Sequence, residues 1–284
     1  MQAKADIAIT QEVIRAMSGT ADPRLRQIME VLVENLHDFA RRTNLTRPEL
    51  DIALDFLNAV GKATNERHNE AVLLADVLGL STLLCDGDPD HAEEAEALLG
   101  PFWRMHSPRT ENGGTICRSA TPGPKLEVHG QVIDAQRQPI AGVEVDVWHA
   151  SPVGLYENQD ENQVDMNLRG KFTTDSEGRF WFTTVLPAGY PVPTHGPVGG
   201  LLKAQGRHPF RPAHLHFLLW KPGYETRISQ VFVNDDQYID TDVVFGVTPG
   251  LIGQYEKQAD GSYRMERTFA MHEGETFIPK PPID

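Results

Sequence analysis

The spacing of apolar residues changes near residue 105 of this 284-residue chain, and this change limits the fold more than any other feature. The run from Leu25 to Arg42 repeats apolar residues at intervals of about three or four positions, which is the pattern of an amphipathic helix. From residue 126 onward, short alternating runs are separated by turn-forming residues, which is typical of strands and tight turns. The two patterns predict an α+β fold, with a helical region at residues 1–105 and a mostly antiparallel β-sandwich at residues 106–284.

Three more helices are expected in the N-terminal region. One begins at Thr46-Arg47-Pro48-Glu49, where threonine and glutamate have the spacing of a capping box and proline is tolerated in the first turn. A second is expected to cover residues 68–84. Residues 91–100 predict a short helix that ends at Gly100, because glycine readily adopts the conformation that terminates helices.

Three pairs of strands are expected in the C-terminal region, each pair flanking a turn. An irregular segment rich in proline and glycine, Leu186–Phe210, separates the second pair from the third, and long ordered loops often carry functional residues. The expected pairs are residues 126–134 with 141–150, 170–175 with 178–185, and 214–220 with 227–233.

The acidic composition excludes several classes of partner. A formal net charge of −14 does not offer the basic surface that a nucleic acid or an anionic membrane needs. The N-terminus has no apolar secretory segment, and the most apolar stretch, residues 72–85, contains Asp76 and is too short to cross a bilayer. We therefore expect a cytoplasmic protein that is not a membrane protein. Cys85 and Cys117 lack metal-ligand spacing and are expected to be reduced thiols.

The segment RPAHLHF, residues 211–217, places two histidines two positions apart on an expected strand. Alternate residues of a strand point to the same face, so His214 and His216 can bind one ion together, or they can lie on a solvent-facing side. Leu215 and Phe217 are apolar and are expected to face the core. An ion held by two neutral histidines needs further ligands, and no CxxC or HExxH pattern supplies them.

Two tyrosines stand in unusual places and could supply those ligands. Tyr156 ends a turn-rich segment, and Tyr190 lies between a glycine and a proline in the irregular segment. Two phenolates and two imidazoles form a hard, oxygen-rich donor set that suits a trivalent ion better than zinc. Iron(III) with two tyrosinates carries one net positive charge, which one hydroxide would neutralise, so a dry pocket could hold it. A metal-free β-sandwich that binds a protein or a carbohydrate remains open at this point.

Five parts of the chain follow one another in an order that points to a known family: LLGPFW (98–103), WHASPVGLY (148–156), GYPVPTHGPVG (189–199), GRHPFRPAHLHF (206–217) and Gln230. They resemble the intradiol ring-cleaving dioxygenases, which hold non-haem Fe(III) with two tyrosines and two histidines. The resemblance implies that Tyr156, Tyr190, His214 and His216 bind one Fe(III) per subunit, and that Tyr190 leaves when the substrate binds. It also implies a homodimer formed through the N-terminal helices, with a phospholipid in the interface.

The same resemblance assigns roles to two further residues. Arg211 falls where the family has an active-site arginine, whose fixed charge would stabilise a substrate dianion. A surface salt bridge is the alternative role for this arginine. Gln230 is implied to form a hydrogen bond near the iron.

The expected substrate is hydroxyquinol (benzene-1,2,4-triol), cleaved with O2 to 3-hydroxy-cis,cis-muconate, the tautomer of maleylacetate. Asp76 stands where family members that act on catechol have an apolar residue or proline, and a third ring hydroxyl could pair with this acid. Asp76 could instead lie on the solvent side of its helix. Catechol or a chlorocatechol, cleaved to cis,cis-muconates, is the alternative substrate. The resemblance implies a substrate wall of Leu73, Asp76, Pro101, Phe102, Pro191, Val192, Arg211 and Val244.

Overall fold

The computed structural model describes residues 2–66, 68–85 and 90–283, and the chain divides into two compact units, Met1–Asn58 and Ala59–Asp284. The first unit is helical, and its boundary at Asn58 falls within the third helix. Its elements are α1 (Gln2–Ala16), η1 (Met17–Gly19), α2 (Pro23–Thr43) and α3 (Arg47–Ala63).

Two predicted features of these helices are confirmed. Helix α2 contains the whole of the expected helix at residues 25–42. Helix α3 begins directly after Thr46, as expected. The backbone N–H of Thr46 donates to Glu49 Oε2 at 2.8 Å, which is the glutamate half of a capping box, and the Thr46 hydroxyl donates to the same oxygen at 2.7 Å. The expected boundary between residues 105 and 106 remains a prediction.

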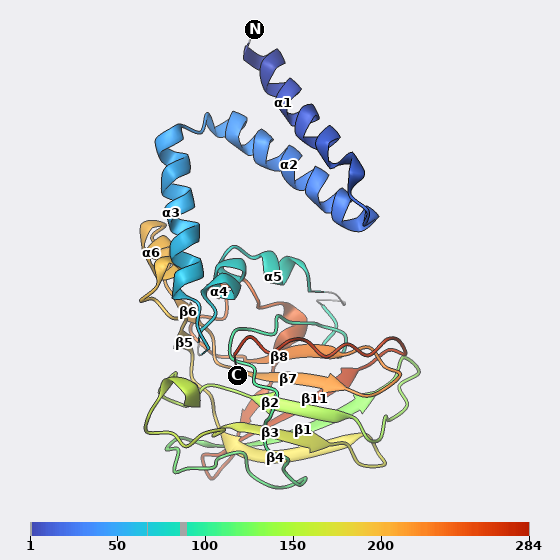
Figure 1. Ribbon diagram of the computed structural model, residues 1–284. Coiled ribbons are helices and arrows are strands. Elements are labelled where there is room, and N and C mark those ends of the chain that lie inside the picture. The colour runs from blue at the N-terminus through green and yellow to red at the C-terminus, as the bar shows by residue number, and fades with distance from the viewer. Residues whose placement is uncertain (1, 67, 86–89, 284) are drawn as a thin grey trace. The chain divides into compact units, whose positions relative to one another are not determined.

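The second unit contains a β-sandwich. In Figure 1, strands β8, β7, β2 and β3 of one sheet follow one another from top to bottom, and strands β11, β1 and β4 of the other sheet overlap them in the view. One sheet has the strand order β3-β2-β7-β8-β9 and the other β10-β11-β1-β4. Pairing is antiparallel except between β1 and β11 and between β8 and β9, which confirms a mostly antiparallel sandwich. The strands are β1 (Lys125–Ile133), β2 (Glu144–Trp148), β3 (Arg169–Thr173), β4 (Arg179–Val185), β7 (His214–Trp220), β8 (Arg227–Val233), β9 (Ile252–Gly253), β10 (Tyr255–Lys257) and β11 (Tyr263–Ala270).

Only the third expected strand pair is a hairpin. Strands β7 and β8 pair with each other, whereas β1 and β2 belong to different sheets, and so do β3 and β4. Each strand buries one face against the opposite sheet, so the chain crosses between the sheets at these turns instead of pairing neighbours side by side. Buried side chains from both sheets form one core cluster, which includes Val128, Phe172 and Phe217.

The predicted helix at residues 68–84 is wrong in its length. The structure has α4 (Glu70–Val77) and α5 (Leu80–Leu83) instead. Gly79 separates them with a φ of +73°, the left-handed conformation that ends a helix. The buried residues of α4 include Leu73 and Asp76, so Asp76 does not lie on a solvent-facing side.

The predicted helix at residues 91–100 is also wrong. One turn forms, in which the backbone N–H of Ala95 donates to the carbonyl of His91 at 2.9 Å. The chain then runs beside β8: Ala97 N–H donates to the carbonyl of Ile228 at 3.0 Å, and the Leu98 carbonyl accepts from Gln230 Nε2 at 2.7 Å. These contacts with the sheet replace the backbone bonds of a helix.

The irregular segment at residues 186–210 contains more structure than the sequence predicts. It holds the short strand β5 (Tyr190–Pro191) and the helix α6 (Pro197–Ala204), and β6 (Phe210–Arg211) begins at its end. Glu70 of α4 accepts a hydrogen bond from Val198 N–H at 2.8 Å, at the N-terminal end of α6. Strands β5 and β6 pair with each other directly before β7. The two remaining short helices are η2 (Glu157–Gln159) and η3 (Pro249–Leu251).

In the part of the chain that the structure describes, no helix is both long enough and apolar enough to cross a membrane. Among the described residues, Cys85 and Cys117 form no disulfide. The cytoplasmic location remains a prediction.

Candidate metal centre

Strand β7 carries both histidines of the RPAHLHF segment and is buried along nearly its whole length. Leu215 and Phe217 belong to the core between the sheets, which confirms their predicted orientation. His214 and His216 lie on the other face of the strand, and each is only 1% exposed. This face is therefore covered by protein, and the solvent-facing alternative for the two histidines is excluded.

Tyr156 and Tyr190 reach the histidines from two loops that touch. The loop of Tyr156 turns at Gly154, where φ is +78° and a Cβ would lie 3.2 Å from the Cβ of Tyr190. Glycine is required there because a side chain would be strained and would crowd Tyr190. In the β5–β6 pair, Tyr190 lies opposite Arg211. Phe102 stacks on the Tyr156 ring, with the ring centroids 4.4 Å apart.

Four polar atoms converge at this point. Tyr156 Oη lies 3.2 Å from Tyr190 Oη and 3.1 Å from His216 Nε2. The Nε2 atoms of His214 and His216 are 3.0 Å apart. The structure thus brings together the four residues that the resemblance implies as iron ligands.

The four side chains are neutral at pH 7 unless a cation binds among them. Burial raises the pKa of both phenols, and that of Tyr156 lies well above its ordinary value. Burial, together with the nearby Arg211 charge, holds the pKa of His214 well below its ordinary value, and burial does the same for His216. His214 Nδ1 lies 2.7 Å from the carbonyl oxygen of Pro212 and must donate its proton there, which leaves a lone pair on Nε2.

This donor set fits a metal ion. Two donors that each lie about 2.1 Å from one ion, at a right angle, are about 3.0 Å apart. The observed separations of 3.0 to 3.2 Å agree with this value. A phenol in a dry pocket loses its proton only beside a strong positive charge, which favours a trivalent ion over zinc. Among the described residues, no three His, Cys, Asp or Glu side chains could hold a metal ion, so a site here depends on the tyrosines.

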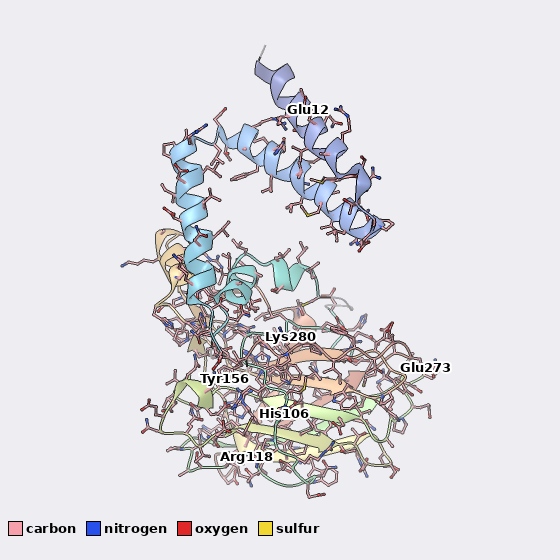
Figure 2. The ribbon with its side chains drawn as sticks, viewed as in Figure 1. Glu12, His106, Arg118, Tyr156, Glu273 and Lys280 are labelled. Carbon is pink, nitrogen blue, oxygen red and sulfur yellow. The ribbon has the colours of Figure 1, made fainter. Side chains whose placement is uncertain are left out.

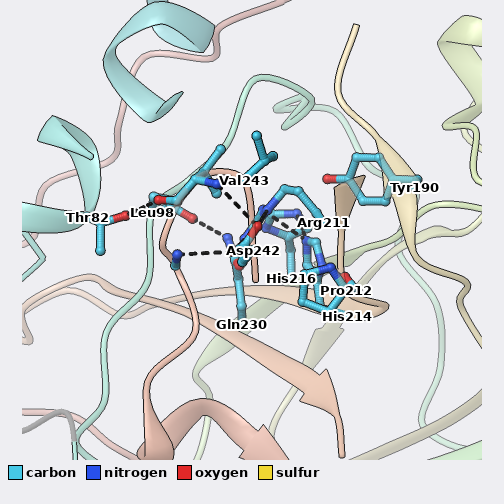
Figure 3. A network of polar contacts seen from close by, with 12 residues as sticks. Thr82, Leu98, Tyr190, Arg211, Pro212, His214, His216, Gln230, Asp242 and Val243 are labelled. Atoms are coloured by element: carbon cyan, nitrogen blue, oxygen red, sulfur yellow. Dashed lines mark hydrogen bonds and ion pairs between the residues drawn. The ribbon is translucent and has the colours of Figure 1, made fainter. Parts of the chain in front are cut away.

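Arg211 lies against the centre and is only 2% exposed, which excludes the surface salt bridge (Figure 3). Its Nη1 is 3.2 Å from His214 Nε2, and its Nη2 donates to Gln230 Oε1 at 2.8 Å. Gln230 lies opposite His216 in the sheet and is fully buried. The structure therefore places both residues beside the four donor atoms.

Asp242 is the residue that sequence reasoning missed. It accepts hydrogen bonds from Nε and Nη2 of Arg211, each at 3.1 Å. Although burial opposes it, the charge of Asp242 raises the pKa of Arg211 above its ordinary value. The two residues stand 31 positions apart, so no local spacing reveals the pair. The only signal was the position of this acid directly before the apolar run VVFGV.

A cavity of about 520 Å³ lies next to the centre. Asp76 and Gly100 both line it, and a Cβ on Gly100 would lie 3.2 Å from the His216 ring. Lys280, labelled in Figure 2, lines it from the C-terminal segment. Of the wall residues that the resemblance implies, only Asp76 is among those that line this cavity. Pro191 is exposed, and Leu73, Pro101, Phe102, Val192 and Val244 are buried outside its lining.

The ionised carboxylate of Asp76 lowers the free energy of unfolding of the protein. Burial raises its pKa from 3.8 to about 6, although a hydrogen bond with Ser81 and the charge of Arg211 oppose the shift. An acid whose pKa is higher in the folded state destabilises the protein above that pKa, and two pH units correspond to about 3 kcal/mol. The cost diminishes as the pH falls through 6 toward 3.8, where the acid is protonated in both states.

Replacement of Asp76 by asparagine is therefore expected to stabilise the iron-free protein at pH 7.5, by up to about 3 kcal/mol. Denaturant unfolding of both proteins at pH 7.5 and at pH 5 measures the difference. The gain should be smaller at pH 5, because the wild-type carboxyl is then largely protonated in the folded state. A gain that is the same at both pH values contradicts this account.

Comparison with known proteins agrees with the fold. A family model described as "Dioxygenase" matches residues 98–272, and one described as "Catechol dioxygenase N terminus" matches residues 22–96. The chain is 40% identical over 266 residues to a 6-chlorohydroxyquinol 1,2-dioxygenase of Cupriavidus pinatubonensis, covering 93% of this chain and 96% of that protein. It is 39% identical over 264 residues to a hydroxyquinol 1,2-dioxygenase of a Rhizobium species, covering 92% and 89%.

A solved structure is similar over the same range. The crystal structure of hydroxyquinol 1,2-dioxygenase from Pseudomonas putida DLL-E4 superimposes with a TM-score of 0.84 at 33% identity, covering 96% of this chain and 100% of that chain. The chain belongs to the intradiol ring-cleaving dioxygenase family.

Proposed function

We propose that this protein cleaves hydroxyquinol between its two vicinal hydroxyls with O2, giving 3-hydroxy-cis,cis-muconate, which tautomerises to maleylacetate. The observation that carries the proposal is the convergence of Tyr156, Tyr190, His214 and His216 beside a cavity that contains a buried acid, Asp76. The names of the relatives from the Rhizobium species and from Pseudomonas putida support the same substrate.

Tyr156, Tyr190, His214 and His216 would hold one Fe(III) per subunit. When bound, iron(III) supplies the Lewis acidity and the electron-accepting character that make a bound catecholate reactive toward O2. One trivalent ion, two phenolates and one hydroxide have a net charge of zero. The ion pair of Arg211 and Asp242 adds no net charge to the pocket, so this charge neutrality is kept.

Side chains of this protein would accept protons from the substrate and stabilise its negative charge. Tyr190 would accept a proton from the diol, because burial raises the pKa of its phenol and so makes the phenolate a strong base. Arg211 presents Nη1 beside His214 and would stabilise the negative charge of the bound diol. Gln230 fixes Arg211 through its Oε1 and is itself fixed by the Leu98 carbonyl.

Iron content and colour test this function against a protein of another class. Tyrosinate bound to Fe(III) absorbs visible light, so the purified protein should be red-brown and contain one iron per chain. A colourless protein without iron would favour the metal-free β-sandwich that binds another molecule.

Asp76 is proposed to select the third hydroxyl of the ring. Replacing it by alanine is expected to lower the preference for hydroxyquinol over catechol by about 1–3 kcal/mol, the value of one lost buried hydrogen bond. The ratio of kcat/KM for the two substrates measures this preference. An unchanged ratio would contradict this role of Asp76 and would favour catechol or a chlorocatechol as the substrate. The name of the Cupriavidus relative adds a chlorinated hydroxyquinol, which keeps the third hydroxyl, to the substrates worth comparing.

The helical region is proposed to form a homodimer, with the β-sandwich at residues 106–284 as the catalytic domain. Apolar side chains recur along α2 and α3 at the spacing of one helix face and are exposed within the single chain, which supports a partner surface. Light scattering of the purified protein measures its mass, and lipid extraction tests for the phospholipid that the resemblance implies. These exposed residues are Leu25, Ile28, Leu32, Leu36, Phe39, Leu50, Leu54 and Leu57.

A further inference from the structure

Asp242 binds one edge of the Arg211 guanidinium with both of its oxygens (Figure 3). Arg211 Nε donates to Oδ1, and Nη2 donates to Oδ2, each at 3.1 Å. The two side chains are 3% and 2% exposed. A planar guanidinium that is bound at two points by one carboxylate cannot turn without breaking both contacts.

The contacts with Asp242 leave one nitrogen of the guanidinium directed at the centre. Nη2 also donates to Gln230 Oε1 at 2.8 Å, so Nε and Nη2 are both engaged inside the protein. Phe232 packs near the guanidinium, with its ring centroid 5.6 Å from the guanidinium carbon. Nη1 is the nitrogen beside the donor atoms, 3.2 Å from His214 Nε2.

Asp242 also fixes part of the implied substrate wall. Its Oδ1 accepts from the backbone N–H of Val244 at 3.3 Å, and its Oδ2 accepts from that of Gly246 at 3.0 Å. The Val244 carbonyl in turn accepts from Thr82 Oγ1 of α5 at 2.8 Å. One carboxylate therefore ties the orientation of Arg211 to the position of Val244.

We propose that Asp242 is a positioning residue for ring cleavage, which holds Nη1 of Arg211 toward the bound diol. Asp242 acts through Arg211 and does not touch the diol itself. The inference rests on the proposed function, because the orientation of Arg211 matters to catalysis only when an anionic ligand binds beside it. The charge of Asp242 also offsets that of Arg211, which lets a buried cation stand next to an iron site without a further counter-ion.

The test compares Asp242→Asn with Asp240→Asn in the iron-loaded protein. Asp240 is an exposed acid in the same loop, so its replacement makes the same chemical change outside the network. Asp242→Asn is expected to lower kcat by about 10- to 100-fold, as is common when a residue that orients a catalytic group is removed. Its iron content and tyrosinate absorption should equal those of the wild type. Asp240→Asn should match the wild type in every readout.

A double variant tests whether Asp242 acts through Arg211. Adding Asp242→Asn to Arg211→Gln is expected to leave kcat at the value of Arg211→Gln alone, because residues that act as a unit are not additive. Asp242→Glu keeps the charge and is expected to recover part of the kcat that Asp242→Asn loses.

Three results would overturn the inference. The first is a kcat of Asp242→Asn equal to that of Asp240→Asn, and the second is a further loss when Asp242→Asn is added to Arg211→Gln. The third is a failure of both Asp242 variants to fold or to bind iron, because Asp242 would then serve the fold and not Arg211. If the iron-loaded wild type consumes no O2 with any diol, the proposed function itself is contradicted. If the wild type is active and any of the three results appears, only this inference fails.

Discussion

Replacement of His216 by alanine is expected to leave the protein folded but largely free of iron and without oxygen uptake. Its Nε2 lies within 3.1 Å of two other proposed donor atoms, so its loss removes one of four ligands. Four-ligand zinc sites in zinc-finger peptides release about 10–16 kcal/mol on binding, or about 3 kcal/mol for each ligand. By analogy, the iron affinity should fall by about 100-fold or more. Titration of the iron-free protein with iron, followed by visible absorption, measures the change.

His149→Ala is the matched control for this variant. His149 is also 1% exposed, but its ring nitrogens contact the Thr184 hydroxyl and the Ala150 carbonyl, away from the four donor atoms. This variant should lose stability through those broken contacts and still bind one iron. A His216→Ala protein that retains one iron per chain and normal activity contradicts the assignment of the centre.

Arg211→Gln is expected to lower the free energy of unfolding of the iron-free protein by about 3–5 kcal/mol, because it leaves the buried Asp242 carboxylate without a counter-charge. Removing the second charge should reverse most of this loss. The double variant Arg211→Gln, Asp242→Asn is therefore expected to be more stable than Arg211→Gln alone. Denaturant unfolding of the iron-free proteins at neutral pH gives both values.

The single variant Asp242→Asn completes this cycle. It also leaves a buried charge, that of Arg211, and should be less stable than the wild type. If the losses of the two single variants simply add in the double variant, the two side chains do not interact energetically, and the pairing described here is not a stabilising contact.

The sequence predicted the class of fold and the residues of the centre for clear reasons. The alternation of β7 fixed the direction of His214 and His216, and the unusual positions of Tyr156 and Tyr190 marked them before any contact was known. The structure brings these four side chains together. Their roles as iron ligands stay a proposal, which the variants above test.

The errors arose where distant contacts decide local structure. Residues 91–100 contain good helix formers, yet hydrogen bonds with Ile228 and Gln230 draw them alongside β8. Two of the strand pairs expected across short turns were wrong, because their strands lie in different sheets. The local sequence pattern predicts a strand but does not indicate which sheet of the sandwich it joins. Asp242 went unnoticed for the same reason, since only the folded chain brings it to Arg211.

Oxygen uptake by the iron-loaded protein tests the central claim most directly, with hydroxyquinol, catechol, a chlorocatechol and pyrogallol compared as substrates. We expect consumption of one O2 per hydroxyquinol, formation of maleylacetate, and a higher kcat/KM for hydroxyquinol than for the other diols. Iron-loaded protein that consumes no O2 with any of them would contradict the claim that this site cleaves aromatic diols. Faster cleavage of catechol than of hydroxyquinol would contradict the role given to Asp76.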